Sequence, residues 1–228
     1  MNRVFLHGFT GDPSVWDELG LSGTAEPLLG HAPHLVDDPG PEGFAGEVDR
    51  LAARLPPPPV HLVGYSMGAR LAAGIATRHP DRIARATLIG LHPGLADPSE
   101  RAARLTDDER WIRLLENEGT SAFADAWEAQ PLFARQPRVP AHQARRRRHD
   151  PHGLALALRR LGLAQMPYLA LALARSAVPL TLVVGERDDK FQALARRVPA
   201  RCVVIPGAGH DVVLEAPDAL ARLLEEPS

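Results

Sequence analysis

Residues 60–70 of the chain read VHLVGYSMGAR, an apolar, β-branched run that leads into Gly-x-Ser-x-Gly. A helix-forming segment, residues 69–77, follows at once. This order of strand, sharp turn and helix is typical of a nucleophile elbow, in which a strained turn lifts a serine hydroxyl clear of the sheet. Gly64 and Gly68 stand where a Cβ would collide with the neighbouring strand or helix. The pattern predicts Ser66 as a reactive hydroxyl at a helix N-terminus, which favours negative charge.

A second motif follows the first apolar strand of the chain. Residues 4–6 form this expected strand, which stops at residues 7–11, His-Gly-Phe-Thr-Gly. A strand followed by His-Gly commonly supplies half of an oxyanion hole, a backbone N–H held beside the nucleophile. We assign this donor to Phe9 and the other half to the N–H of Met67. The alternative is an ordinary turn at the end of a strand.

Composition limits the classes of function. The chain has 228 residues, 45% of them hydrophobic, enough for one domain with a sizeable core. Its formal net charge of -2 argues against nucleic acid or a membrane surface as partner. No apolar run reaches the length of a membrane span, and the apolar stretch within the first eight residues is too short for a signal peptide. The lone Cys202 lies in an apolar run and is expected to pack there. We expect a cytoplasmic protein; the sequence leaves its oligomeric state open.

Strands and helices alternate along most of the chain. Further strands are expected at residues 34–36, 60–65, 86–89, 180–184 and 202–205. Helices are expected at residues 44–55 and 217–224, and Ser14 can cap a short helix that runs to Leu19. Alternation at these short spacings predicts an α/β fold with a mainly parallel sheet of about six strands and helices on both faces.

The pattern changes between residues 99 and 174, where we find helical periodicity and no convincing strand. The expected helices lie at residues 100–118, 120–128, 154–163 and 169–174. A helical block between two strands of a parallel sheet predicts an all-helical cap over the carboxyl edge, where ligands bind. We expect residues 1–91 and 175–228 to form the core and residues 92–174 to form this cap.

Three residue types at strand ends complete a catalytic pattern. The chain order is Ser66, then Asp188 after the strand at 180–184, then His210 after the strand at 202–205. This is the order of the α/β-hydrolase triad, in which the histidine takes the serine proton and the acid orients and stabilises the imidazole. Asp189 adjoins Asp188, so either carboxylate could serve, and we favour Asp188.

One alternative is a metal site. Residues 149–152, His-Asp-Pro-His, are the nearest approach to a metal cluster, but two imidazoles and one acid are common by chance. We expect neither a metal nor a cofactor.

With the triad assigned, the chain resembles the family of 2-succinyl-6-hydroxy-2,4-cyclohexadiene-1-carboxylate synthases, lyases of α/β-hydrolase fold. The resemblance covers nearly the whole chain and rests on four motifs: LHGFTG at 6–11, GYSMGAR at 64–70, GERDDKF at 185–191 and AGHDVVLE at 208–215. Its more specific parts are Arg70 directly after the elbow, the Asp-x-Lys-Phe ending at 188–191 and a cap pattern. That pattern comprises residues 93–95, 100–104, 127, 131–133 and 148. Ala69 departs from the family, since many relatives carry a second glycine there.

The resemblance implies a reaction of menaquinone biosynthesis. Its substrate, 2-succinyl-5-enolpyruvyl-6-hydroxy-3-cyclohexene-1-carboxylate, carries several carboxylates, and the triad removes a proton so that pyruvate leaves without an acyl-enzyme. The residues implied to line the substrate pocket are Tyr65, Arg70, Arg104, Trp127 and Arg148. Arginines suit a polyanion because they stay charged and bind carboxylates in a bidentate manner. Any of them could instead solvate a helix face, and Trp127 could anchor the cap.

Two other functions remain open from the residues alone. An esterase or C–C hydrolase on a small carboxylated substrate would use the same triad through an acyl-enzyme. A catalytically silent ligand receptor of the same fold would commonly lack a triad member, and none is missing here.

Overall fold

The computed structural model of the chain describes residues 1–32, 43–133 and 136–226. Six parallel strands form one sheet in the order β2-β1-β3-β4-β5-β6. Their bounds are β1 Asn2–Leu6, β2 Thr24–Glu26, β3 Val60–Tyr65, β4 Ile83–Ile89, β5 Leu180–Gly185 and β6 Arg201–Ile205. The register pairs the ends of neighbouring strands, Tyr65 with Ile89 and Gly185 with Ile205. The predicted parallel sheet is confirmed, and its carboxyl ends meet at one edge.

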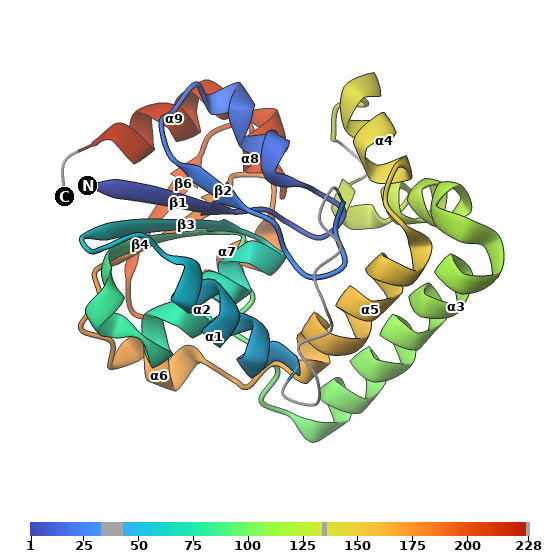
Figure 1. Cartoon of the computed structure of the whole chain (residues 1–228), viewed down its shortest axis with the longest axis horizontal. Helices are drawn as coiled ribbons and strands as arrows, with labels where there is room; N and C mark the ends of the chain where they lie inside the picture. Colours follow the sequence, from blue (N-terminus) through green and yellow to red (C-terminus); the bar gives the residue numbers. More distant parts are fainter. Residues whose placement is uncertain (33–42, 134–135, 227–228) are drawn as a thin grey trace.

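Helices cover both faces of the sheet because side chains alternate between the faces along each strand. Val4 and Leu6 pack into the core under one face, and Phe5 packs into the core under the other. The first face carries α1 (Gly43–Arg54), α2 (Met67–Arg78), α6 (Ala170–Ala174) and α7 (Asp189–Ala195). The second carries the 3₁₀ helix η1 (Pro13–Leu19), α8 (Val212–Glu215) and α9 (Pro217–Glu225). Figure 1 shows the sheet between α1 and α2 on one side and α8 and α9 on the other.

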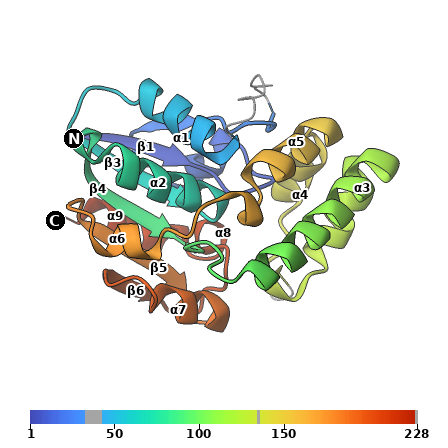
Figure 2. The same ribbon diagram turned by 90° about the horizontal axis from the view of Figure 1, so that it is seen from below.

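The segment between β4 and β5 is helical, as expected. It includes α3 (Pro98–Glu128), α4 (Pro140–Arg147) and α5 (Pro151–Leu161), together called the cap helices below, and the short 3₁₀ helices η4 (Pro131–Phe133) and η5 (Leu163–Gln165). The two helices expected at 100–118 and 120–128 form the single element α3, interrupted at Gly119, whose φ is 79°. Figures 1 and 2 show α3 and α5 side by side beyond the carboxyl ends of the strands. Helix α4 was not predicted, and the division into core and cap at residues 92 and 174 stays a prediction.

Several local expectations are wrong. The cap of η1 is Asp12, two positions before Ser14, because Pro13 is the first residue of the helix; the Asp12 carboxylate accepts the Ser14 N–H at 2.9 Å. Cys202 is exposed rather than packed because β6 is an edge strand. The strand expected at residues 34–36 lies outside the described residues, and β2 at Thr24–Glu26 has no strong apolar pattern. Within the described ranges, no helix has the length and apolar character to cross a bilayer.

Candidate active site

Ser66 sits in the turn between β3 and α2 with backbone angles of φ 52° and ψ -106°. Its N–H donates to the carbonyl of Ile89 at 2.8 Å, which ties the turn to β4. A Cβ on Gly68 would lie 2.1 Å from the Leu6 carbonyl oxygen, and one on Gly64 would lie 2.4 Å from the Gly68 carbonyl oxygen. Only glycine fits at either position, and this steric requirement explains why the Gly-x-Ser-x-Gly pattern predicts the turn.

The imidazole of His210 lies between Ser66 and Asp188. Its Nε2 atom is 3.3 Å from Ser66 Oγ, and its Nδ1 atom is 2.7 Å from Asp188 Oδ2. The other oxygen of Asp188 accepts the Phe191 N–H at 3.2 Å, so this carboxylate also caps α7. Asp189, the first residue of α7, is exposed. The acid in contact with His210 is therefore Asp188.

This arrangement fixes the proton positions needed for base chemistry. A carboxylate only accepts hydrogen bonds, so Nδ1 of His210 carries the proton and donates it to Asp188. Nε2 is then free to accept the Ser66 hydroxyl proton. The ring of Phe191 packs on the imidazole with a centroid separation of 4.2 Å, and Tyr65 contacts it at 5.6 Å. The three groups together can activate Ser66 as a base or as a nucleophile.

The two predicted oxyanion donors border the same space. Phe9 and Met67 both line the cavity that contains Ser66. Met67 is the first residue of α2, so its N–H is among those that lack an intrahelical acceptor. Phe9 belongs to the loop at residues 8–11, called the oxyanion loop below, in which the Gly11 N–H donates to the Gly8 carbonyl at 3.0 Å.

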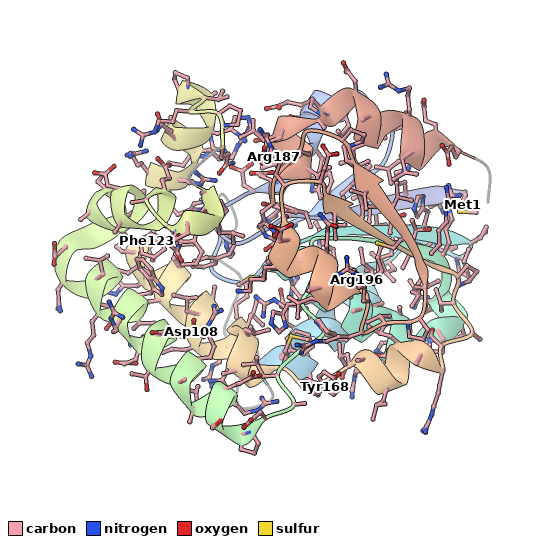
Figure 3. All side chains as sticks on the ribbon, turned by 180° about the vertical axis from the view of Figure 1, so that it is seen from behind. Met1, Asp108, Phe123, Tyr168, Arg187 and Arg196 are labelled. Atoms are coloured by element: carbon pink, nitrogen blue, oxygen red, sulfur yellow. The ribbon has the colours of Figure 1, made fainter. Side chains whose placement is uncertain are left out.

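Two cavities meet at Ser66. The larger has a volume of about 760 Å³, and the smaller about 60 Å³. Both are lined by Phe9, Ser66, Trp127 and Phe133. Of the predicted site residues, the larger cavity also contains Met67, Arg70, Arg104, Asp188 and His210, and the smaller contains Tyr65. Figure 3 shows Asp108 and Phe123 on α3 with Arg187 on the core side opposite them.

Arg70 is a buried cation without a carboxylate. Its Nη1 atom donates to the Leu161 carbonyl at 2.7 Å and lies 3.9 Å from the Met166 sulfur. Within the described part of the chain, no carboxylate is paired with it. Burial, reinforced by the nearby charge of Arg104 and opposed by that of Asp108, lowers the pKa of Arg70 to about 9. Because a buried charge without a direct ion pair is costly, this guanidinium can receive an anion in the cavity that also contains Ser66.

Arg104 and Trp127 reach the larger cavity from α3. The Nε atom of Arg104 donates to Asp108 Oδ1 at 2.8 Å, while the other Asp108 oxygen is buried without a partner. Burial raises the pKa of Asp108. Trp127 stacks on Phe123 at 5.3 Å and meets the edge of Phe9 at 5.2 Å, so it lines the cavity and anchors the cap helices at once.

The structure places Arg148 outside both cavities, contrary to the prediction. Its guanidinium pairs with the buried carboxylate of Asp12. Arg145 and Arg146, from the same run, line the smaller cavity instead. Arg146 pairs with Glu128 at 3.0 Å and lies 5.8 Å from the Phe133 ring centroid. Arg148 follows the last turn of α4, so its side chain leaves the helix toward η1 rather than toward Ser66.

Two basic residues in the larger cavity were not predicted to belong to the site. Lys190 and His92 both line the larger cavity. Burial, with the charges of Arg70 and Lys190, lowers the pKa of His92 to about 3, so this ring is neutral and its Nδ1 accepts the Gly94 N–H at 3.2 Å. The signal for His92 was present, since it follows a strand end one position before a Pro-Gly turn.

The predicted alternative of a metal at residues 149–152 is not supported by the geometry. His149 is buried, and both of its ring nitrogens bond to backbone groups: Nδ1 accepts the Ala32 N–H at 3.0 Å, and Nε2 donates to the Thr10 carbonyl at 3.0 Å. No group of three or more potential metal ligands is found among the described residues.

The chain is similar in sequence to a family of known proteins. The profile described as "Alpha/beta hydrolase family" matches residues 4–223. The 2-succinyl-6-hydroxy-2,4-cyclohexadiene-1-carboxylate synthase of Enterobacter sp. (strain 638) is 36% identical over 237 residues, covering 98% of this chain and 90% of the relative. The enzyme of that name from Salmonella typhimurium is 36% identical over 238 residues, covering 97% and 92%.

Solved structures agree with the sequence relatives. MenH from S. aureus superposes with a TM-score of 0.89 at 28% identity, covering 98% of this chain and 91% of that one. An esterase from Thermogutta terrifontis superposes with a TM-score of 0.79 at 23% identity, covering 98% and 88%, a likeness of fold alone.

Proposed function

The chain belongs to the α/β-hydrolase family and, within it, to the 2-succinyl-6-hydroxy-2,4-cyclohexadiene-1-carboxylate synthases, and we propose that it eliminates pyruvate from the enolpyruvyl substrate of that reaction in menaquinone biosynthesis. It is then a carbon-oxygen lyase that needs no cofactor and acts on a small polyanionic substrate in the cytoplasm. The similarity to named synthases over nearly the full length of both chains supports this assignment.

The observation that carries the proposal is the buried guanidinium of Arg70 in the cavity that also contains Ser66 and His210. Arg70, Arg104 and Lys190 line one cavity with the reactive serine. Arg70 has a carbonyl as its hydrogen-bond acceptor where a buried cation would ordinarily have a carboxylate. A substrate with several carboxylates supplies the missing anion, and guanidinium groups suit it because they bind carboxylates at two points. A neutral ester would leave the charge of Arg70 uncompensated.

In the proposed mechanism, Ser66 and His210 together act as the general base, and Asp188 orients the imidazole. The Ser66 oxygen takes a proton from substrate carbon as its own proton passes to Nε2 of His210. The electron pair of the broken C–H bond forms one double bond of the diene, the ring double bond shifts to form the other, and the C–O bond to the enolpyruvyl group breaks. The enolate of pyruvate leaves with the electrons of that bond and takes the proton from Nε2 of His210 to become pyruvate. The amides of Phe9 and Met67 stabilise the charge that develops on oxygen. Tyr65, Arg70, Arg104 and Trp127 position the substrate.

An esterase or C–C hydrolase would use the same contacts but pass through an acyl-Ser66. The Ser66–His210 distance of 3.3 Å serves both chemistries, so it does not separate them. The arginines do, because a pocket for neutral esters gains nothing from them.

The test supplies the purified protein with freshly prepared enolpyruvyl substrate and follows pyruvate with a coupled dehydrogenase. We expect rapid pyruvate release that Ser66→Ala reduces to the spontaneous rate, measured in the same assay without protein. A 4-nitrophenyl ester run in parallel should be a poor substrate. Pyruvate release no faster than in the Ser66→Ala sample, with efficient ester hydrolysis, would overturn the lyase in favour of the hydrolase.

A further inference from the structure

The oxyanion loop contains a strained residue that is not glycine. Thr10 has a φ of 66°, and the only other non-glycine residue at positive φ among those described is Ser66. A β-branched residue pays a particular steric penalty in this region, because its Cβ and branched atoms crowd the backbone. Such a conformation persists only where the surrounding contacts over-determine it.

Two imidazoles from distant segments hold Thr10 in this conformation. The Thr10 N–H donates to His31 Nε2 at 3.2 Å, and the Thr10 carbonyl accepts from His149 Nε2 at 3.0 Å. His31 precedes α1 in the core, whereas His149 lies between α4 and α5 among the cap helices. Both polar backbone groups of the strained residue are therefore fixed by side chains, and the two rings meet edge to face with a centroid separation of 5.4 Å.

His149 also connects the cap helices to a second core segment. Its Nδ1 atom accepts the Ala32 N–H at 3.0 Å, and its backbone carbonyl accepts the Thr120 hydroxyl of α3 at 2.8 Å. Because Nδ1 accepts, the ring proton must lie on Nε2, which is the atom that donates to Thr10. Burial lowers the pKa of His149, in keeping with this neutral tautomer.

Phe9, whose N–H is the proposed oxyanion donor, directly precedes Thr10, and its ring also contacts both the core and the cap helices. Its ring contacts His31 at 5.5 Å on the core side and Trp127 at 5.2 Å and Phe123 at 6.0 Å on the cap side. The Phe9 side chain is therefore packed between the core and the cap helices, and His149 bonds to the carbonyl of the residue that follows it.

We propose that His149 is a positioning residue that couples the seating of the cap helices to the geometry of the oxyanion hole, an inference that rests on the proposed role of the Phe9 amide. The hole is complete only when His149 donates to the Thr10 carbonyl. Because an oxyanion donor acts on charge that develops in the transition state, loss of this bond lowers kcat and leaves KM nearly unchanged.

The test compares His149→Phe, which removes both ring bonds, with His149→Gln, whose amide keeps a donor for Thr10. We expect kcat of His149→Phe to fall about ten-fold or more for pyruvate elimination, with KM within about two-fold of wild type. His149→Gln should recover much of this loss. The control is His152→Phe, an exposed histidine one turn further along, which should behave as wild type.

A reagent that needs no substrate separates this inference from the proposed function. The Ser66 oxygen attacks the phosphorus of a 4-nitrophenyl phosphonate and displaces 4-nitrophenolate, while the hydroxyl proton passes to His210. The phosphonyl oxygen then occupies the oxyanion hole, and mass spectrometry detects the added group on intact protein. His149→Phe should slow this labelling about as much as it slows kcat, even if wild type releases no pyruvate. Thr120→Val, which releases only the backbone of His149, should slow labelling several-fold and keeps the test valid if His149→Phe does not fold.

Three outcomes would overturn the inference. They are an unchanged labelling rate in a folded His149→Phe protein, an equal loss in His152→Phe, and a wild-type Ser66 that the phosphonate does not label. A loss confined to KM would equally assign His149 to substrate binding and not to the oxyanion loop.

Discussion

The Nε2 atom of His210 lies 3.3 Å from the Oγ atom of Ser66, although 144 positions of the chain separate the two residues. Ser66 follows β3, and His210 follows β6 at the far side of the sheet. They meet because all strands are parallel, so loops that leave their carboxyl ends converge on one edge. The two strands between them hold this distance as part of the rigid core.

Asp188 rather than Asp189 should be required for activity. Asp188→Asn removes the charge that stabilises the imidazolium and allows the wrong tautomer of His210, so we expect kcat to fall by roughly 10³-fold to 10⁴-fold. Asp189→Asn is the matched control and should retain activity, because that side chain is exposed. Measurement of kcat for both proteins decides the assignment, and a larger loss in Asp189→Asn would reverse it.

Arg70→Met should weaken substrate binding without unfolding the protein. Loss of the partner of a buried carboxylate costs about 2 kcal/mol or more, so KM for the polyanionic substrate should rise roughly 30-fold. Since Arg70 forms no direct ion pair, removal of its buried charge offsets the lost bond to Leu161 and the lost attraction to Asp108, and the free energy of unfolding in urea should change little. Arg113→Met, an exposed residue of α3, is the control. A neutral ester hydrolysed as poorly as the polyanion by Arg70→Met would contradict the role in anion binding.

Asp108 should act on the substrate only through Arg104. Asp108→Asn removes the charge that orients the Arg104 guanidinium, so we expect KM to rise several-fold, and less than in Arg104→Met. KM of the double variant should equal that of Arg104→Met alone, because without the Arg104 guanidinium the Asp108 carboxylate has nothing to orient. A double-mutant cycle on KM measures this, and simple additivity would show that Asp108 acts independently.

The protein should lose stability on mild acidification. Burial lowers the pKa of His7 to about 4 and, with the charge of Arg85, that of His61 to about 3, and burial lowers that of His92 to about 3. An unfolded histidine titrates near 6.5, so between about pH 6.5 and 4 the unfolded chain binds protons that the folded protein does not. Each depressed pKa thus contributes stability that is present above 6.5 and lost as the pH falls toward the folded value.

We therefore expect the free energy of unfolding to fall by about 1 kcal/mol or more per histidine between pH 6.5 and 5.5. Guanidinium chloride titrations at half-unit pH steps measure the slope, which gives the number of protons taken up. His152→Asn, with an exposed side chain, should leave the slope unchanged. A stability that stays level through this range would mean that these rings take up protons in the folded protein over the same pH range as in the unfolded chain.

Some elements of the chain are encoded by local sequence signals, and others are not. The elbow at Ser66 was predictable because its signals are local: a β-branched strand, two glycines that no Cβ can replace, and a helix. Element β2 and helix α4 were missed because a three-residue edge strand and an eight-residue, arginine-rich helix carry little apolar periodicity. Exposure of Cys202 follows from the position of β6 at the edge, which the order of strands along the chain does not reveal.

By itself, the sequence determined the α/β architecture and the order Ser66, Asp188, His210, because strand and helix periods are local and parallel strands bring their ends together. Only the tertiary structure decided which cations face the cavity. Arg145 and Arg146 reach it while Arg148 pairs with Asp12, since the rotation of α4 is set by partners on η1 and α3 that lie far away in the sequence. The same long-range packing brings His149 onto Thr10, and no local pattern encodes that contact.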